Sequence, residues 1–404
     1  MMIYVPVPLH LLAVGRTIPV DLWDKTGKLL LRKGRALESE QHRDMLAAHA
    51  ASVTESDAHV WQRSHERVLH AMARAGRSAQ DAAQEPMPAE IRESDYLVGP
   101  DDQDRSWLVL RERLQRLLYQ TQSAVEPVIR IEELQRSVLS LLAEEPDECL
   151  FVLFQALADL TLGYCATHAL LSAVVCDLTA QKVGMAMSDR DSLFAAALLM
   201  NIGMAREQDG LSQQSALPNE AQRHLIRTHP QRSVEILRAL GVVDEAALDI
   251  VRWHHDPEAE LGPHAVLQGR RLLRVADQFV AKLASRKTRL AMSPLGAAKS
   301  MVFDGSAQEP SYASAVAMAV GFYPPGTYVQ LVNGEKAVVV ARGARAHDAH
   351  AVSIIGAGGM PLAQYQYRDV REPRFAVRAP VNAEKIRVVV NFEKAYKAWA
   401  DARG

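Results

Sequence analysis

The residues of this chain best suited to chemistry are four histidines and an aspartate in its middle part. They are His168, His229, the adjacent pair His254 and His255, and Asp277 in the segment LLRVADQF. Imidazole and carboxylate groups are ligands that divalent metals share, and side chains converging from several helices often build such a site. Adjacent helical residues point about 100° apart, so His254 and His255 can both reach one cleft only near a helix end. The five residues together predict a metal site that only the tertiary fold could assemble.

A simpler interpretation is open for each of these residues. The chain has 14 histidines, so several would fall in a helical region by chance. A single buried histidine is more often hydrogen-bonded to its neighbours than bound to a metal. The pair His254-His255 is the stronger indication, because two adjacent imidazoles in an apolar helix need partners for two polar rings.

The elements that would position these residues are helices. From about residue 106 to residue 300, apolar residues recur at three- and four-residue spacing, which predicts a multi-helix bundle over residues 107–320. Glycines and prolines mark the places where its helices should begin or end. These are Pro146, Gly163, Gly203, Pro218, Pro230, Gly241, Pro257 and Gly262.

Small β-rich modules are expected on both sides of the bundle. Residues 1–53 alternate apolar stretches with turn signals, and Lys25-Thr26-Gly27 should close a hairpin. Residues 54–106 have weak periodicity and are predicted to be a linker, partly disordered or helical. Residues 321–404 contain strand-like alternation around an Asn333-Gly334 turn and a final helix at NFEKAYKAWAD. The predicted fold class is therefore mainly α, with small β-rich N-terminal and C-terminal modules.

Composition excludes several classes of function. A formal net charge of -2 gives no basic surface for nucleic acid. The three cysteines contain no close pair typical of a zinc or redox motif, and a reducing cytoplasm is the expected compartment. The apolar stretch 150–175 carries Asp159 and His168 near its centre, which favours a pair of buried helices over a membrane span.

The order of the motifs resembles the HD-GYP subgroup of the HD phosphohydrolase superfamily. The resemblance runs from a helix with His168 through LFAAALLMNIGMA, THPQRSVEILRALG and IVRWHHDPE to RRLLRVADQFVAKLASRKTRLAMSP. It covers roughly residues 130 to 305 and extends into GFYPPGTYVQLVNGEKAVVV. The module before the linker also resembles, more weakly, one found ahead of some members.

The resemblance implies a fold of HD type and a ligand set. Active members hydrolyse cyclic di-GMP at a centre of two or three metals, usually iron or manganese, where a bridging hydroxide attacks phosphorus. By position, His168 matches the first helix histidine of the family and His229 the histidine of its H-x-x-x-G segment. His254 and His255 match its paired histidines, and Asp277 the aspartate of its V-A-D segment.

The motif that defines the family is absent. The family has His-Asp, two further residues and a lysine, where this chain has Met200-Asn201-Ile202-Gly203-Met204. A thioether is a poor ligand for iron or manganese, and a neutral amide cannot supply the anionic oxygen that bridges two cations. Met204 likewise replaces an ammonium group that could contact phosphate. We therefore expect no catalytic residues of the family type, the motif being lost at Met200, Asn201 and Met204.

Two neighbouring segments depart from the family as well. The glycine-tyrosine-proline segment is reduced to Glu260-Leu261-Gly262-Pro263 in a shortened loop, and Val280 stands where a further aspartate is common. Arg286 and Arg289 lie where the family places two basic residues that meet the phosphates of the substrate, which would suit ligand binding. The alternative is that they are a solvated helix end that complements the helix dipole.

A residual metal site is a separate hypothesis. His229, His254 and His255 could still hold one ion, and His168 and Asp277 belong to the same residual set. The alternative is that these side chains only hydrogen-bond in a packed or wet cavity. No cofactor is expected, with a single divalent ion, iron or manganese, as the open alternative.

Three functions remain in competition. The leading prediction is a signalling protein of the cyclic di-GMP network without phosphodiesterase activity, acting by nucleotide binding or by contacts with other signalling proteins. The rival is an active metal-dependent phosphohydrolase with an altered metal site. A third is a related bundle that serves only as an interaction platform, against which the YPPGTYVQLVNGE segment favours the HD-GYP branch.

Overall fold

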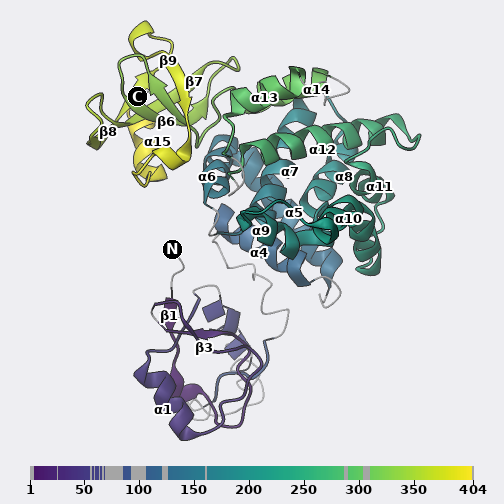
Figure 1. The fold of residues 1–404 in the computed structure, drawn as a ribbon, viewed down its shortest axis with the longest axis vertical. Coiled ribbons are helices and arrows are strands. Elements are labelled where there is room, and N and C mark those ends of the chain that lie inside the picture. The colour runs from purple at the N-terminus through teal and green to yellow at the C-terminus, as the bar shows by residue number, and fades with distance from the viewer. Residues whose placement is uncertain are drawn as a thin grey trace. The chain divides into compact units, whose positions relative to one another are not determined.

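The chain forms two compact units, Met1–Gln103 and Asp104–Gly404 (Figure 1). The computed structural model describes residues 4–24, 26–54, 57–58, 60–62, 64–65, 68, 85–91, 106–120, 126–159, 162–285, 290–303 and 310–402.

The N-terminal unit is built on a small antiparallel sheet with strand order β1-β4-β2-β3. Its elements are β1 (Tyr4–Pro6), β2 (Leu22–Trp23), β3 (Leu29–Leu31), α1 (Glu40–Ala48) and β4 (Ser52–Thr54). The predicted hairpin joins β2 to β3, although Lys25 itself lies outside the described residues. Asp24 shapes this turn, because its Oδ1 accepts hydrogen bonds from the backbone N–H groups of Thr26 and Lys28.

Part of the segment expected to be a linker contributes to this unit. Trp61 and Met87 are buried in its hydrophobic core. The indole Nε1 of Trp61 donates a hydrogen bond to the carbonyl oxygen of Pro88, at 2.9 Å. The weak periodicity of the segment gave no sign of these contacts, because isolated side chains make them rather than one apolar face.

The second unit contains the predicted helical bundle, and the mainly α fold class is confirmed. Its helices are α4 (Trp107–Gln120), α5 (Pro127–Glu144), α6 (Pro146–Ala158), α7 (Tyr164–Lys182), α8 (Met187–Leu199), α9 (Ala205–Gln213), α10 (Glu220–Ala239), α11 (Glu245–Trp253), α12 (His264–Leu283), α13 (Pro294–Phe303) and α14 (Pro310–Val320). A short 3-10 turn, η5 (Ile202–Met204), lies between α8 and α9. Helix α7 is buried on nearly all sides, as expected of a helix that is apolar all round, and it packs against α4, α6, α8, α12 and α14.

The prediction of a helix end at Pro230 was wrong. Pro230 lies inside α10, whereas the other glycines and prolines of the set lie at helix ends or in connections. A proline has no N–H, so the carbonyl of Ile226, one turn earlier, lacks its usual partner. The ring of His229 takes that place, because its Nδ1 donates to the carbonyl oxygen of Ile226 at 2.8 Å. The helix therefore continues through the proline.

None of the helices in the described residues is both long and apolar enough to span a bilayer. The apolar stretch 150–175 is divided between α6 and α7, which Gly163 separates. Gly163 has a φ of 91°, a conformation that glycine adopts without strain. The two helices pack against each other, as predicted for a buried pair.

The C-terminal part is an antiparallel sheet with strand order β8-β7-β6-β5-β9, covered by one helix (Figure 1). Its elements are β5 (Tyr328–Leu331), β6 (Lys336–Arg342), β7 (Ala349–Ile355), β8 (Pro361–Asp369), β9 (Val377–Val381) and α15 (Phe392–Ala400). The Asn333-Gly334 turn joins β5 to β6, and Gly334 has the positive φ that such a turn needs. The predicted hairpin and final helix are both confirmed.

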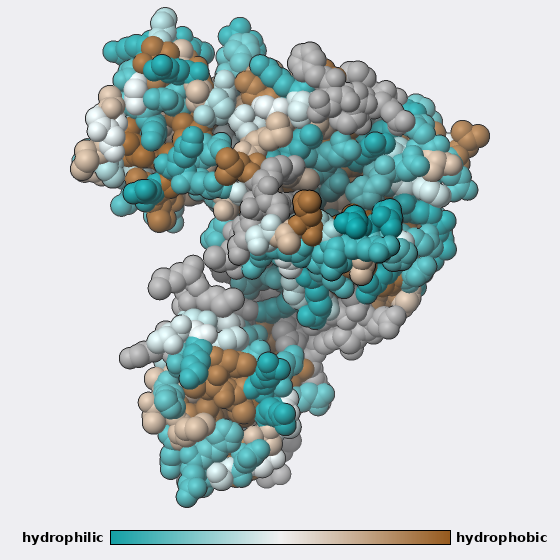
Figure 2. Space-filling model, in the orientation of Figure 1, coloured by the Kyte–Doolittle hydropathy of each residue, from teal (hydrophilic) through white to brown (hydrophobic). Residues whose placement is uncertain are grey.

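The sheet lies directly against α6. Gly326, just before β5, packs so closely that a Cβ there would lie 2.4 Å from the carbonyl oxygen of Phe151. The hydroxyl of Tyr328 donates to Gln155 on α6 at 2.9 Å, and Arg342 on β6 forms an ion pair with Asp147. On the face drawn in Figure 2, hydrophilic residues cover most of the described surface of the helical bundle, and the hydrophobic residues of the bundle appear there in small groups.

Candidate metal centre

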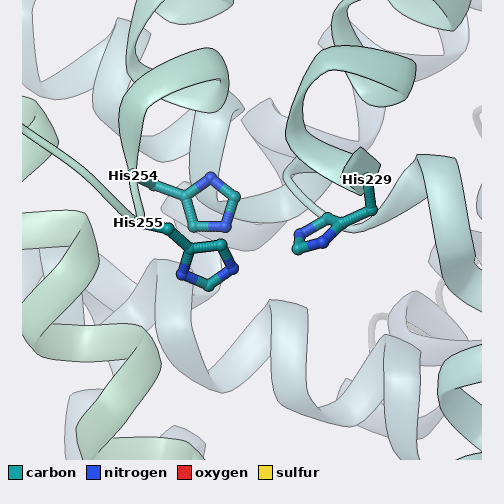
Figure 3. Close-up of side chains that lie close together, drawn as sticks. All are labelled: His229, His254 and His255. Atoms are coloured by element: carbon teal, nitrogen blue, oxygen red, sulfur yellow. The ribbon is translucent and has the colours of Figure 1, made fainter. Parts of the chain in front are cut away.

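Three imidazoles meet at the centre of the candidate site. His229 comes from α10, and His254 and His255 directly follow α11 (Figure 3). One ligand nitrogen from each residue can be chosen so that all three lie within 4.8 Å of one another. The ring centroids are 4.0 Å apart for the adjacent pair, and 5.3 and 5.1 Å from His229 to His254 and His255. His229 and His254 are fully buried, whereas His255 is exposed.

Helix carbonyls fix the orientation of the two buried rings. Nδ1 of His229 donates to Ile226, and Nδ1 of His254 donates to the carbonyl oxygen of Val251 at 2.7 Å. The first carbonyl is free because of Pro230, and the second is free because it lies in the last turn of α11. A carbonyl can only accept a hydrogen bond, so both Nδ1 atoms carry the proton. The lone pair of each ring is therefore on Nε2.

These two Nε2 atoms are buried and have no hydrogen-bond partner among the residues that the structure describes. Burial lowers the pKa of His229 to about 4. Burial and the neighbouring imidazoles lower the pKa of His254 well below its usual value. Both rings are therefore neutral near pH 7, which is the form that binds a metal. An unpartnered buried acceptor costs free energy, so a ligand at this place would relieve a penalty.

The other two predicted residues form a pair beside the cluster. Nε2 of His168 on α7 is 2.7 Å from Oδ1 of Asp277 on α12, and its Nδ1 is 2.9 Å from the hydroxyl of Tyr164. Burial alone would raise the pKa of Asp277, but the hydrogen bond and charge of His168, with contributions from His255 and His254, hold it well below its usual range. Both nitrogens of His168 are engaged, so it orients Asp277 rather than offering a free nitrogen.

The segment from Met200 to Met204, which we predicted to stand in place of the family motif, lies against the same turn of α10. Met200 and Asn201 are buried, and within the described part of the chain the Nδ2 of Asn201 has no hydrogen-bond partner. A Cβ on Gly203 would lie 2.8 Å from the carbonyl oxygen of His229. Ser233 joins the two segments, because its Oγ accepts from the N–H of Gly203 at 3.0 Å and donates to the carbonyl oxygen of Met200 at 2.8 Å.

Not every predicted residue can be placed. Arg286 and Arg289 lie outside the described residues. Val280, where the family commonly has an aspartate, is fully buried in the hydrophobic core. Sequence reasoning missed Tyr164 and Arg270. Arg270 shares a face of α12 with Asp277, which was the available signal, since a charged residue on the buried side of a helix needs a partner.

The donor set fits one divalent cation. His229 and His254 would hold it through their free Nε2 atoms, with His255 as the exposed third ligand, and such a cation would supply Lewis acidity. His168 and Asp277 form a hydrogen-bonded pair that is not part of this group of three donors. The residues present do not fit a bridged pair of cations, because Met200 and Asn201 offer no anionic oxygen.

One comparison with known proteins covers the residues of this site. Residues 165–282 match the family model of the HD domain, and this segment contains His168, the three clustered histidines and Asp277. The chain thus carries a domain of the HD superfamily. Among solved structures, Bd1817, an HDG"Y"P protein from Bdellovibrio bacteriovorus, shares 14% sequence identity over 78% of this chain and 98% of that one, with a TM-score of 0.43. No curated protein matches the chain.

Proposed function

We propose that the chain is a degenerate HD-GYP-like signalling protein of the cyclic di-GMP network that does not hydrolyse the nucleotide. The observation that carries the proposal is the chemistry at Met200 and Asn201. Both side chains are buried, and the resemblance assigns them to the place of the family's His-Asp motif. The carbonyl oxygen of Met200 is bonded to Ser233, one turn after His229 on α10. A thioether and a neutral amide supply neither the nitrogen ligand nor the charge that two dications around one hydroxide require.

The environment of Met200 supports the proposal that the nucleotide is not hydrolysed. Its side chain belongs to the hydrophobic core of the bundle, with no exposed surface. A buried apolar side chain stabilises the fold by itself, without a bound metal or water. The helical framework is thus compatible with a binding role that involves no turnover.

Two modes of action belong to this proposal. In the first, cyclic di-GMP binds without being cleaved, and Arg286 and Arg289 would contact its phosphates as the resemblance implies. In the second, the domain acts only through contacts with other signalling proteins. Calorimetric titration with cyclic di-GMP separates them, because heat at micromolar ligand that is lost in an R286A/R289A double variant supports the first. No heat at high micromolar ligand leaves the second.

A second candidate function rests on the three-imidazole cluster. Two buried, neutral Nε2 atoms without partners could hold a single cation, and a single-metal phosphohydrolase with an altered site would use it. This function predicts one tightly held metal ion per chain and hydrolysis of cyclic di-GMP or its linear product. It also predicts that H254A and D277A abolish that turnover.

Metal analysis and a hydrolysis assay on the same preparation distinguish the two functions. The protein is purified without a histidine tag, and its iron, manganese and zinc contents are measured before and after incubation with each ion. We expect at most one ion per chain and no cleavage of either nucleotide. Two tightly held ions per chain, or cleavage that H254A removes, would contradict the proposed function.

A further inference from the structure

One buried arginine holds the chain on both sides of the histidine pair. The side chain of Arg270 on α12 is 1% exposed. Its Nε and Nη2 donate to the two carboxylate oxygens of Asp249 on α11, at 2.6 and 2.7 Å. Its Nη1 donates to the backbone carbonyl oxygens of Pro257 and Glu260, at 3.1 and 2.6 Å. The carboxylate lies before the pair in the sequence, and the two carbonyls lie after it.

The loop after the pair depends on this guanidinium. Residues 256–263 connect α11 to α12 without regular structure, and two of their carbonyl groups turn inward to Arg270. Gly262 packs closely as well, since a Cβ there would lie 3.2 Å from Nη2. Without the guanidinium these inward carbonyls would lack a donor, and the loop would have to rearrange to reach water.

The same contacts tie together the two helices that carry the site. Asp249 is on α11, whose last turn leads into His254, and Arg270 lies about two turns before Asp277 on α12. Only the planar guanidinium group of an arginine can bind a carboxylate at two points and still donate to backbone carbonyls. Lysine offers a single point charge and cannot reproduce this arrangement.

We propose that Arg270, held by Asp249, is a positioning residue that fixes His254 and His255 for cation binding. This inference rests on the single-cation site discussed under the proposed function, and it assigns to that site the residue that determines its geometry. Arg270 itself touches no cation. It acts through the backbone on both flanks of the pair.

The test compares Arg270 with its neighbour Arg271. Arg271 also joins α12 to the same loop, through an ion pair with Glu258, but both side chains are partly exposed, at 26% and 38%. The full chain without a histidine tag is titrated calorimetrically with Co²⁺ as wild type, R270K, D249N, R271K and E258Q. Partners that orient metal ligands typically change metal affinity about 10–100-fold, so we expect a loss of about tenfold or more in R270K and D249N. R271K and E258Q should stay within about threefold of wild type.

A second readout does not depend on the metal. Hydrogen exchange of backbone amides in residues 250–263 should be faster in R270K and D249N than in R271K, with far-UV circular dichroism unchanged. If R270K fails to fold, D249N decides, because it keeps the guanidinium and weakens its anchor.

Each outcome has a definite meaning. Unchanged Co²⁺ affinity in R270K and D249N, or an equal loss in R271K, would overturn the positioning role. If the wild type binds no Co²⁺, the cation site fails together with the positioning role, and the exchange data then report only whether Arg270 rigidifies the loop.

Discussion

Ser233 shows how a single hydroxyl can hold the irregular segment from Met200 to Gly203. The resembling family has glycine at this position, whereas here the hydroxyl bridges Met200 and Gly203 across two elements. Both bonded groups are buried backbone atoms at the irregular junction between α8 and α9. The serine thus satisfies two groups that no helix or strand would satisfy.

Replacing Ser233 by alanine should destabilise the protein by about 1–3 kcal/mol, because it leaves a buried carbonyl and a buried N–H unpaired. Urea denaturation measures the change in the free energy of unfolding. Ser137 on α5 provides the control, since its hydroxyl donates to the carbonyl oxygen of Glu133 within its own helix and joins no second element among the described residues. S137A should change stability by less than about 0.5 kcal/mol, and an equal effect of both variants would contradict the bridging role.

At the residue scale, the residue types nominated the histidines, and their grouping was predicted only through the resemblance to the family. The spacing of His229, His254 and His255 along the chain contains no local geometry, and the tertiary fold alone brings them within reach of one another. The pairing of His168 with Asp277, 109 residues apart in the sequence, was equally invisible. The role of Arg286 and Arg289 stays a prediction.

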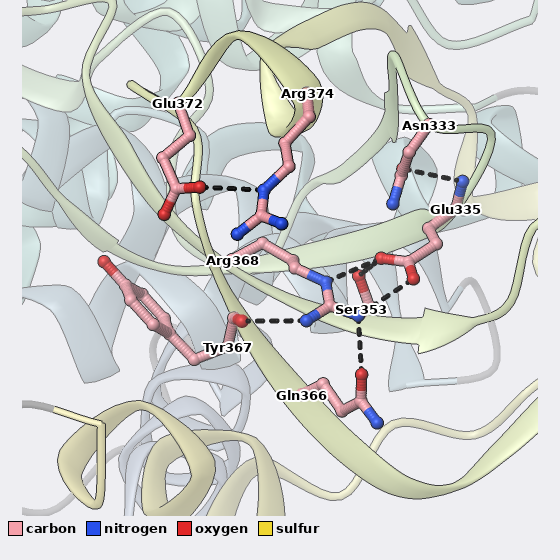
Figure 4. Close-up of polar contacts among 8 residues, drawn as sticks. All are labelled: Asn333, Glu335, Ser353, Gln366, Tyr367, Arg368, Glu372 and Arg374. Carbon is pink, nitrogen blue, oxygen red and sulfur yellow. Dashed lines mark hydrogen bonds and ion pairs between the residues drawn. The ribbon is translucent and has the colours of Figure 1, made fainter.

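At the scale of elements, the C-terminal sheet contains a polar network between β6, β7 and β8. Glu335 precedes β6 and accepts hydrogen bonds from Arg368 on β8 and Ser353 on β7, as Figure 4 shows. The hydrogen bonds from Arg368 lower the pKa of Glu335 to about 2, against the opposing effect of burial, with smaller contributions from Ser353 and Asn333. The carboxylate is therefore more acidic in the folded chain than in the unfolded one.

This difference predicts a pH dependence of stability. A carboxylate whose pKa is depressed by folding stabilises the fold fully above its unfolded pKa of about 4.5, and the contribution is lost as the pH falls toward about 2. The wild type should therefore unfold at a higher temperature than E335Q at pH 6, and the gap should narrow between pH 4.5 and 2. Thermal unfolding followed by circular dichroism measures it.

A second glutamate serves as the control for this experiment. Glu372 pairs with Arg374 on the surface of the same sheet, with both side chains exposed. E372Q removes a carboxylate of similar location and should lower the unfolding temperature at pH 6 by much less than E335Q. If the difference in unfolding temperature between wild type and E335Q stays constant from pH 6 to pH 2, the pH dependence does not come from Glu335.

Helix and strand periodicity predicted the elements well, and the error at Pro230 has a physical cause. The rule that proline ends a helix counts the lost backbone hydrogen bond and the strain of the ring. It does not count a side chain that takes the place of the missing donor, as His229 does. The contacts of Arg270 were also missed, because its partners lie on a different helix and in a loop, and helix periodicity does not reveal them.

At the scale of the second unit, the attachment of the sheet to the bundle rests on close backbone contact. Gly326 meets Phe151 of α6, and the side chain of Gln155 binds both Tyr328 and the carbonyl of Gly326. Phe151 packs in one hydrophobic cluster with residues of the sheet and α15. The sheet therefore completes the burial of α6.

Two glycines with similar backbone angles test this attachment. Gly326 has a φ of 85° and Gly359, in the turn between β7 and β8, a φ of 82°, but only Gly326 has neighbours where a Cβ would lie. G359A should cost about 1–2 kcal/mol for the left-handed backbone alone. G326A should cost about 1–3 kcal/mol more, because the methyl group would collide with the carbonyl of Phe151. Chemical denaturation of both variants measures the difference, and equal costs would argue against close packing.

The contact between Gly326 and Phe151 also limits how this part of the molecule can evolve. A larger residue at 326 would require a shift of the α6 backbone, which no substitution at 151 can provide, so position 326 should stay glycine in any homologue that keeps this junction. The ion pair of Asp147 and Arg342 is constrained as well, because Asp147 also accepts from the backbone N–H of Arg342 and Arg342 also donates to the carbonyl oxygen of Ala319. Exchanging the two charges would lose both of these bonds, so related sequences should keep the acid at 147 and the arginine at 342 together with the glycine at 326.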